Sequence, residues 1–216
     1  QAVLTDGERE LGVCMVDIGA GTTDIAIFTG GSIRYTATLP VGGDQVTGDI
    51  AYGVRTPTAN AEEIKVRYAC AKTDLAHAEE TIQVPSVGDR PPRRLARQAL
   101  AQSVQARYEE IFEMVEDELR RSGFDSLVAA GIVLTGGAAR MEGALELAEE
   151  MFQKMVRLGV PQGIEGLGEV VQSPLHATGI GLLMHAVRSG GPRLGSGSPG
   201  GGGLLARVRN WLQRNF

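Results

Sequence analysis

The stretch VDIGAGTTD, residues 16–24, carries the strongest indication of the fold, because it joins an apolar strand to a hairpin through a turn with two glycines. Leu11 to Ile18 is almost entirely apolar, which is typical of a strand buried on both faces. Gly19 and Gly21 let the backbone turn tightly, and successive amides in such a turn form an anion-binding concavity. Asp17 could hold a hydrated cation or orient a water beside a phosphate. A plain hairpin turn capped by an aspartate is the alternative for this motif alone.

A second glycine turn favours a nucleotide. The stretch IVLTGGAAR, residues 132–140, is another apolar strand that ends in paired glycines, and a helix is expected after it, over residues 141–155. This order of strand, turn and helix suits a phosphate or a ribose–purine edge. Glu62 and Lys65 lie three residues apart on a predicted helix and share a face that could grip the ribose or purine, although a solvated salt bridge is the simpler interpretation of that pair alone. The two turns together predict one ligand held between crossover units.

Hydrophobic periodicity predicts the remaining elements. Strands are expected over residues 24–29, 32–39, 81–87, 131–134 and 156–158, and helices over 44–54, 58–71, 95–121 and 175–187. The net charge of −5 and the pI near 5.3 argue against nucleic acid as a general partner. The chain starts at Gln1 and its first strand follows within a dozen residues, so we expect an N-terminal part to be missing.

Arginines cluster at the N-terminal end of the long predicted helix. Arg90, Arg93, Arg94 and Arg97 precede or open it, and Arg107 follows two to three turns later. Cations at a helix N-terminus oppose the helix dipole, so a partner is a better explanation than local stability. We predict that Arg93, Arg97 and Arg107, with Tyr108 as an apolar neighbour, bind an acidic peptide. The alternative is a solvated basic surface paired with nearby glutamates, Glu109, Glu110 and Glu113.

The last residues predict a membrane-binding helix on a tether. Residues 189–203 consist almost entirely of Gly, Ser and Pro, which is typical of a flexible linker. In the following segment, 204–216, six apolar side chains fall within an arc of about 140° with arginines beside it. They are Leu204, Leu205, Val208, Trp211, Leu212 and Phe216. Such a helix lies in an anionic membrane surface. A helix docked on a partner or on its own chain is the alternative.

These motifs resemble those of a known superfamily. Residues 17–24 resemble the second phosphate loop of the actin, heat-shock-chaperone and sugar-kinase superfamily, 134–140 its adenosine motif, and 174–183 its second connecting helix. The similarity is closer to one family. The segments ERELGVCMVDIGAGTTDIAIFTGG, PSVGDRPPR and AAGIVLTGGAARMEG, together with the terminal amphipathic helix, resemble the FtsA family of bacterial cell-division actin homologues.

The resemblance implies an α/β fold, namely an actin-like (ribonuclease-H-like) ATPase lobe with a mixed sheet flanked by helices. Residues 1–188 would form the second lobe, subdomain 2A with 2B inserted near 55–125. Residues 189–203 would be the linker and 204–216 the membrane-targeting helix. The first phosphate loop and first connecting helix would belong to a preceding part, so this chain would carry half of the nucleotide site.

The resemblance also implies roles for individual residues around ATP and Mg²⁺. Asp17 would face the metal and the attacking water. Gly19, Ala20, Gly21 and Thr22 would wrap the β- and γ-phosphates. Glu62 and Lys65 would meet the ribose and adenine, and Gly136, Gly137, Ala138 and Arg140 would line the α-phosphate and adenosine.

The function that the resemblance implies is that of a scaffold. Such a protein binds ATP, polymerises and tethers the tubulin homologue FtsZ to the cytoplasmic face of the bacterial inner membrane, as a peripheral protein at the division site. It is at most a slow ATPase. Its partners would be the FtsZ C-terminal peptide, further copies of itself, an anionic membrane surface and other divisome proteins. The alternatives are a phosphotransferase or a chaperone-type ATPase on the same fold.

Overall fold

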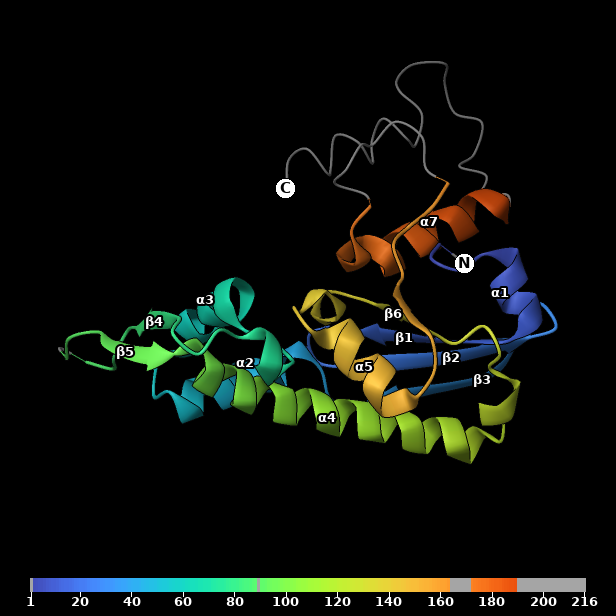
Figure 1. Ribbon diagram of the computed structural model, residues 1–216. Helices are drawn as coiled ribbons and strands as arrows, with labels where there is room; N and C mark the ends of the chain where they lie inside the picture. Colours follow the sequence, from blue (N-terminus) through green and yellow to red (C-terminus); the bar gives the residue numbers. More distant parts are fainter. Residues whose placement is uncertain (1, 89, 164–171, 190–216) are drawn as a thin grey trace, which may run out of the picture. The chain divides into compact units, whose positions relative to one another are not determined.

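The computed structural model describes residues 2–88, 90–163 and 172–189. The chain divides into two compact units, Gln1–Met184 and His185–Phe216. The described strands and helices, drawn in Figure 1, belong to the first unit, except for the end of the helix at residues 177–188, which passes into the second unit after Met184. Of the second unit, the structure describes the last turn of that final helix and Ser189.

The first unit is built on a five-stranded mixed sheet in the order β3-β2-β1-β6-β7. The strands are β1 (Val13–Ile18), β2 (Thr23–Thr29), β3 (Ser32–Leu39), β6 (Ile132–Thr135) and β7 (Val156–Leu158). β1, β2 and β3 are antiparallel, whereas β6 runs parallel to both β1 and β7. Gly30 and Gly31 connect β2 to β3 with φ of 57° and 73°, which fits a two-residue hairpin turn.

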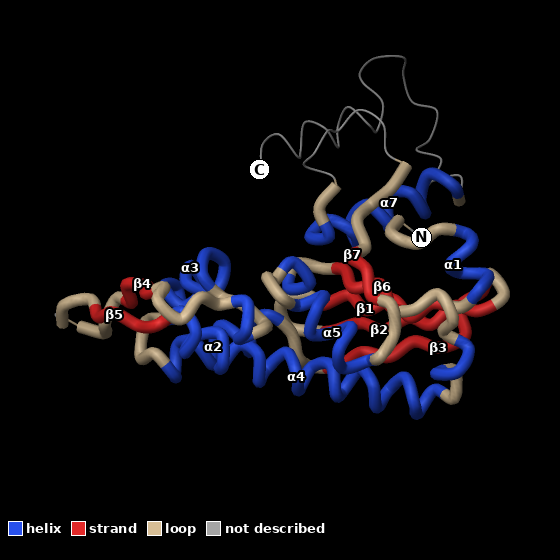
Figure 2. Tube along the Cα trace, viewed as in Figure 1, coloured by secondary structure: helices blue, strands red, loops and turns tan. Residues whose placement is uncertain are grey.

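Helices cover both faces of the sheet (Figure 2). Alternate side chains of β1 point to opposite faces, so the strand contributes to the core on both sides. Val16 and its neighbours on that face pack with α4 (Arg97–Ser122) and α5 (Ala144–Phe152) in the main core. Val13 joins a second cluster with α7 (Ala177–Arg188) and the N-terminal segment. Apolar residues every three or four positions along α4 are buried, as the periodicity predicts. The predicted mixed sheet flanked by helices is confirmed.

A smaller helical layer follows the third strand. It contains α2 (Gly43–Gly53), α3 (Thr58–Tyr68) and a separate hairpin of β4 (Thr81–Val84) with β5 (Arg93–Ala96). Short 3₁₀ turns η1 (Thr73–Leu75), η2 (Asp125–Leu127), η3 (Ala138–Arg140) and η4 (Pro174–His176) connect the larger elements. α2 and α3 pack on each other, and α2 also packs on α4.

Two local predictions are wrong. Leu11 belongs to α1 (Asp6–Leu11), which Thr5 and Glu8 begin with a capping box and Gly12 ends at φ 111°, so the first strand starts only at Val13. Residues 93–96 form β5, which moves the start of the long helix from residue 95 to 97. The remaining expected elements agree to within a few residues. Residues 190–203 of the predicted tether and the amphipathic helix 204–216 lie outside the described residues.

Candidate nucleotide-binding site

The two glycine turns lie side by side at one edge of the sheet. β1 and β6 are parallel neighbours, with Asp17 opposite Thr135, so their carboxyl ends meet. Gly136 follows β6 at φ 90°, and a Cβ built there would lie 2.4 Å from Asp17 Oδ1 and 2.4 Å from the carbonyl oxygen of Ile18. A side chain does not fit in that space. Glycine at this position therefore allows the second turn to pack against the first.

The first turn leaves backbone donors available. The Gly19 N–H closes the turn by donating to the Thr22 carbonyl at 2.9 Å. The amides of Ala20 and Gly21 donate to no acceptor in the part of the chain that the structure describes, and both residues are exposed. Free adjacent amides of this kind suit a phosphate group. The Thr22 hydroxyl is already paired with Asp24, at 3.3 Å, so it braces the turn.

A third segment, which the sequence analysis did not identify, holds this turn in place. Gly43 N–H donates to the Gly19 carbonyl at 2.9 Å, and Asp44 N–H donates to the Ala20 carbonyl at 2.8 Å. The start of α2 is thus hydrogen-bonded to the phosphate turn. A Cβ at Gly42 would lie 2.6 Å from the Ala20 oxygen, so the approach requires glycine. The signal in the sequence is the Gly-Gly pair directly before a predicted helix.

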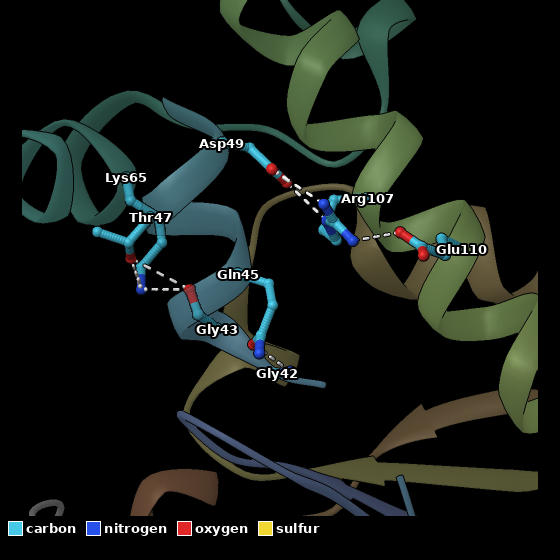
Figure 3. A network of polar contacts seen from close by, with 8 residues as sticks. All are labelled: Gly42, Gly43, Gln45, Thr47, Asp49, Lys65, Arg107 and Glu110. Atoms are coloured by element: carbon cyan, nitrogen blue, oxygen red, sulfur yellow. Dashed lines mark hydrogen bonds and ion pairs between the residues drawn. The ribbon is translucent and has the colours of Figure 1, made fainter. Parts of the chain in front are cut away.

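Lys65 of α3 reaches the start of α2 (Figure 3), and Glu62 of the same helix pairs with it. The Lys65 ammonium lies 3.0 Å from the Gly43 carbonyl, 2.8 Å from the Thr47 hydroxyl and 2.7 Å from Glu62 Oε2. The helical salt bridge of the simpler interpretation is therefore present, but it is only partly solvated, because 14% of the Lys65 side chain is exposed. Burial opposes the charged form of Glu62, but hydrogen bonds from Lys65 and Thr47 outweigh it and lower its pKa. Half of the Glu62 side chain remains exposed.

The second turn also presents backbone N–H donors, and a hydrogen bond from α4 supports it. The amides of Gly137 and Ala138 meet no acceptor among the described residues. The Ala138 carbonyl accepts a hydrogen bond from the Tyr108 hydroxyl at 2.8 Å. Arg140 is exposed at the end of the turn. Gly43 lies close to both Lys65 and the second turn. A Cβ built on Gly43 would lie 3.4 Å from Lys65 Nζ and 3.6 Å from Ala138 Cβ.

Asp17 is the acidic group at the centre of this edge. Burial raises its pKa, a hydrogen bond from the Thr178 hydroxyl at 2.6 Å opposes the rise, and the Asp24 charge adds to it. Among residues 2–88, 90–163 and 172–189 there is no group of three or more His, Cys, Asp or Glu side chains that could hold a metal ion directly.

The residues predicted to bind a peptide have intramolecular partners instead. Arg97 contacts Glu80 and Glu142, and its side chain is 12% exposed. Arg107 makes two contacts with Asp49, at 2.6 and 2.9 Å, and a third with Glu110 (Figure 3). Arg93 donates to the Val54 carbonyl. These contacts supply the local stabilisation that the dipole argument did not foresee, and Glu110 is one of the glutamates named in the alternative. Peptide binding by these arginines stays a prediction.

The prediction for Tyr108 also needs a correction. It is fully buried, so the prediction that it lies beside a docked peptide is wrong. Its ring packs edge-on against Phe112, with the ring centroids 5.9 Å apart, and its hydroxyl supports the second glycine turn. The sequence held the signal, because Tyr108 falls on the same apolar stripe of α4 as Val104 and Ile111.

The six residues predicted to contact a membrane fall outside the described part of the chain. They are Leu204, Leu205, Val208, Trp211, Leu212 and Phe216. Within the described part, no helix has the length and apolar character needed to cross a bilayer.

Comparison with solved structures identifies the fold. The chain superimposes on MreB5 of Spiroplasma citri bound to ADP with a TM-score of 0.65 and 17% identity, over 84% of this chain and 56% of that one. It matches the MamK double helical filament with a TM-score of 0.55 and 21% identity, over 77% of this chain and 54% of that one. At these identities the likeness concerns the fold alone, and the predicted actin-like lobe is confirmed.

Comparison with known sequences identifies the family. The family model for cell division protein FtsA matches residues 14–181. The cell division protein FtsA of Pseudomonas aeruginosa is 58% identical over the whole of this chain, which covers 54% of that protein. The chain thus spans about half the length of the curated relatives it matches. With most of its length matched by the family model, and both glycine turns inside the matched region, the chain belongs to the FtsA family of cell division proteins.

Proposed function

We propose that the protein carrying this chain acts in cell division as an ATP-binding scaffold that polymerises and tethers FtsZ to the cytoplasmic membrane. The observation that carries the proposal is the meeting of two glycine turns, each with free amides, beside Lys65 and Glu62 at one sheet edge. The free backbone amides form a donor set that suits the phosphates of a nucleotide.

The assignment of atoms follows the positions of these groups. The exposed amides of Ala20 and Gly21 would meet the β- and γ-phosphates, and the turn at Gly137 and Ala138 would meet the α-phosphate and the nucleoside. The half-exposed carboxylate of Glu62 is free to accept ribose hydroxyls, with Lys65 holding it in place. Mg²⁺, when bound, neutralises phosphate charge, and Asp17 would contact its water shell. The ADP bound to MreB5 supports the choice of an adenine nucleotide.

Assembly and attachment extend the proposal beyond the described residues. The MamK filament supports polymerisation, since it is built from the same fold. FtsZ would dock through its acidic C-terminal peptide on the surface that carries Arg93 and Arg107, where the peptide would compete with their intramolecular acceptors. Residues 204–216 would lie in the membrane surface. ATP would then act more as a switch for assembly than as fuel, with hydrolysis slow at most.

Binding measurements on the intact protein test this proposal. ADP and ATP are titrated in the presence of Mg²⁺, and the protein is sedimented with anionic vesicles with and without an FtsZ C-terminal peptide. We expect nucleotide binding, vesicle binding and recruitment of the peptide to vesicles. Trp211→Glu should abolish vesicle binding while nucleotide affinity and folding are retained. Absence of nucleotide binding would refute the site, and full vesicle binding by the variant would refute the membrane helix.

A further inference from the structure

Asp17 is held at two points by elements that are distant in sequence. Its Oδ2 accepts a hydrogen bond from Thr178 Oγ1 at 2.6 Å, across 161 positions of the chain. Its Oδ1 faces Gly136, where a Cβ would come within 2.4 Å of it. No other side chain donates a hydrogen bond to Asp17 in the described ranges. The direction of this carboxylate therefore depends on Thr178 and on the space over Gly136.

Thr178 sits on a well-anchored part of α7. Its neighbours Ala177 and Ile180 are buried against the sheet in the second core cluster. Before them, Pro174 is buried and Ser173 caps η4 by accepting from the Leu175 N–H. A rigid support of this kind is what a precisely placed polar group requires. The hydroxyl is thus brought to Asp17 by tertiary packing of the helix.

The contact is not a local helix interaction. A threonine near the start of a helix commonly bonds a backbone group of its own turn. Thr178 is exposed, yet its hydroxyl donates a hydrogen bond to the Asp17 carboxylate at the end of β1. Because the residue is exposed, replacing it by valine changes no buried packing.

We propose that Thr178 is a positioning residue: its hydroxyl fixes one oxygen of Asp17 so that the other stays beside Gly136, where the two glycine turns meet. This inference rests on the proposed nucleotide binding. Asp17 acts through the water shell of Mg²⁺ in that proposal, so the loss of Thr178 Oγ1 should weaken the Mg²⁺-dependent part of nucleotide affinity. Groups that orient a metal-bound ligand from outside typically contribute about 10-fold to 100-fold in metal affinity.

The test compares Thr178→Val, which removes the hydroxyl at constant shape, with Thr178→Ser, which keeps it. ADP affinity of the intact protein is measured by calorimetry with Mg²⁺ and again with EDTA. We expect Thr178→Val to lose about 10-fold in affinity with Mg²⁺ and to match the wild type with EDTA, whereas Thr178→Ser matches the wild type in both. Thr36→Val, an exposed threonine on β3, is the control and should change neither value.

The outcomes separate this inference from the function on which it rests. If the wild type binds ADP and Thr178→Val keeps the full Mg²⁺ effect, Thr178 does not position Asp17. Equal losses in the Val and Ser variants would also overturn the proposal, because they would point to shape rather than to the hydroxyl. A wild type that binds no nucleotide would instead refute the proposed function, and this inference with it.

Discussion

Replacing Tyr108 by Phe tests whether α4 supports the second glycine turn. The change removes the hydroxyl that donates to the Ala138 carbonyl at 2.8 Å and leaves the ring in place against Phe112. The Ala138 oxygen keeps a second donor, the Met141 N–H at 3.1 Å, so it is not left without a partner. The cost should then be close to the net value of one hydrogen bond, about 1 kcal/mol, rather than that of an orphaned buried carbonyl.

The assay is chemical denaturation of wild type and variant, compared at their midpoints with a common slope. A loss of about 1 kcal/mol corresponds to a drop in melting temperature of about 2–4 °C for a domain of this size. Tyr52→Phe is the matched control, because Tyr52 is 90% exposed, and it should change stability by less than about 0.5 kcal/mol.

The pH dependence provides a second check on Tyr108. Burial raises the pKa of its hydroxyl, so the group remains a protonated donor throughout the neutral range. The difference in stability between wild type and Tyr108→Phe should accordingly be constant from neutral to mildly alkaline pH. Equal midpoints for Tyr108→Phe and Tyr52→Phe would refute the reasoning, since the hydrogen bond to the turn would then contribute nothing.

Two further predictions concern the N-terminal contact and the first turn. Hydrogen bonds from Arg157 lower the pKa of Glu8 from 4.5 to about 2, so its stabilisation is complete above pH 4.5 and is lost as pH falls toward 2. Denaturation of Glu8→Gln from pH 6 to acid should show a deficit that shrinks over that window; a pH-independent deficit would contradict it. Gly42→Ala should displace the turn, because its Cβ would lie 2.6 Å from the Ala20 oxygen, and should weaken ADP binding. Gly48→Ala in α2, with no atom within 4 Å, is the control and should keep wild-type affinity.

Local signals in the sequence were sufficient for the strands of the main sheet and for the two glycine turns. The apolar run before Gly19 and the one before Gly136 each predict a buried strand without reference to the rest of the chain. Glycines then mark the turns, and at Gly136 the φ of 90° and the close approach of Asp17 require one. Short elements could not be predicted from such local signals. Residues 93–96 become β5 through pairing with β4, and periodicity over four residues carries too little information to reveal that partner.

The partners that polar side chains find in distant elements were decided by the tertiary structure alone. Asp49 lies 58 positions from Arg107, and Thr178 lies 161 positions from Asp17, so no spacing rule could connect either pair. A charge run or a lone threonine looks unpaired in sequence because its acceptor comes from another element. The sequence by itself determined the strands of the main sheet and the two glycine turns, since these depend on local backbone and apolar pattern, and its motifs indicated the family. Only folding decided which charges are paired between distant elements and how Asp17 is oriented, since those depend on distances in the folded chain.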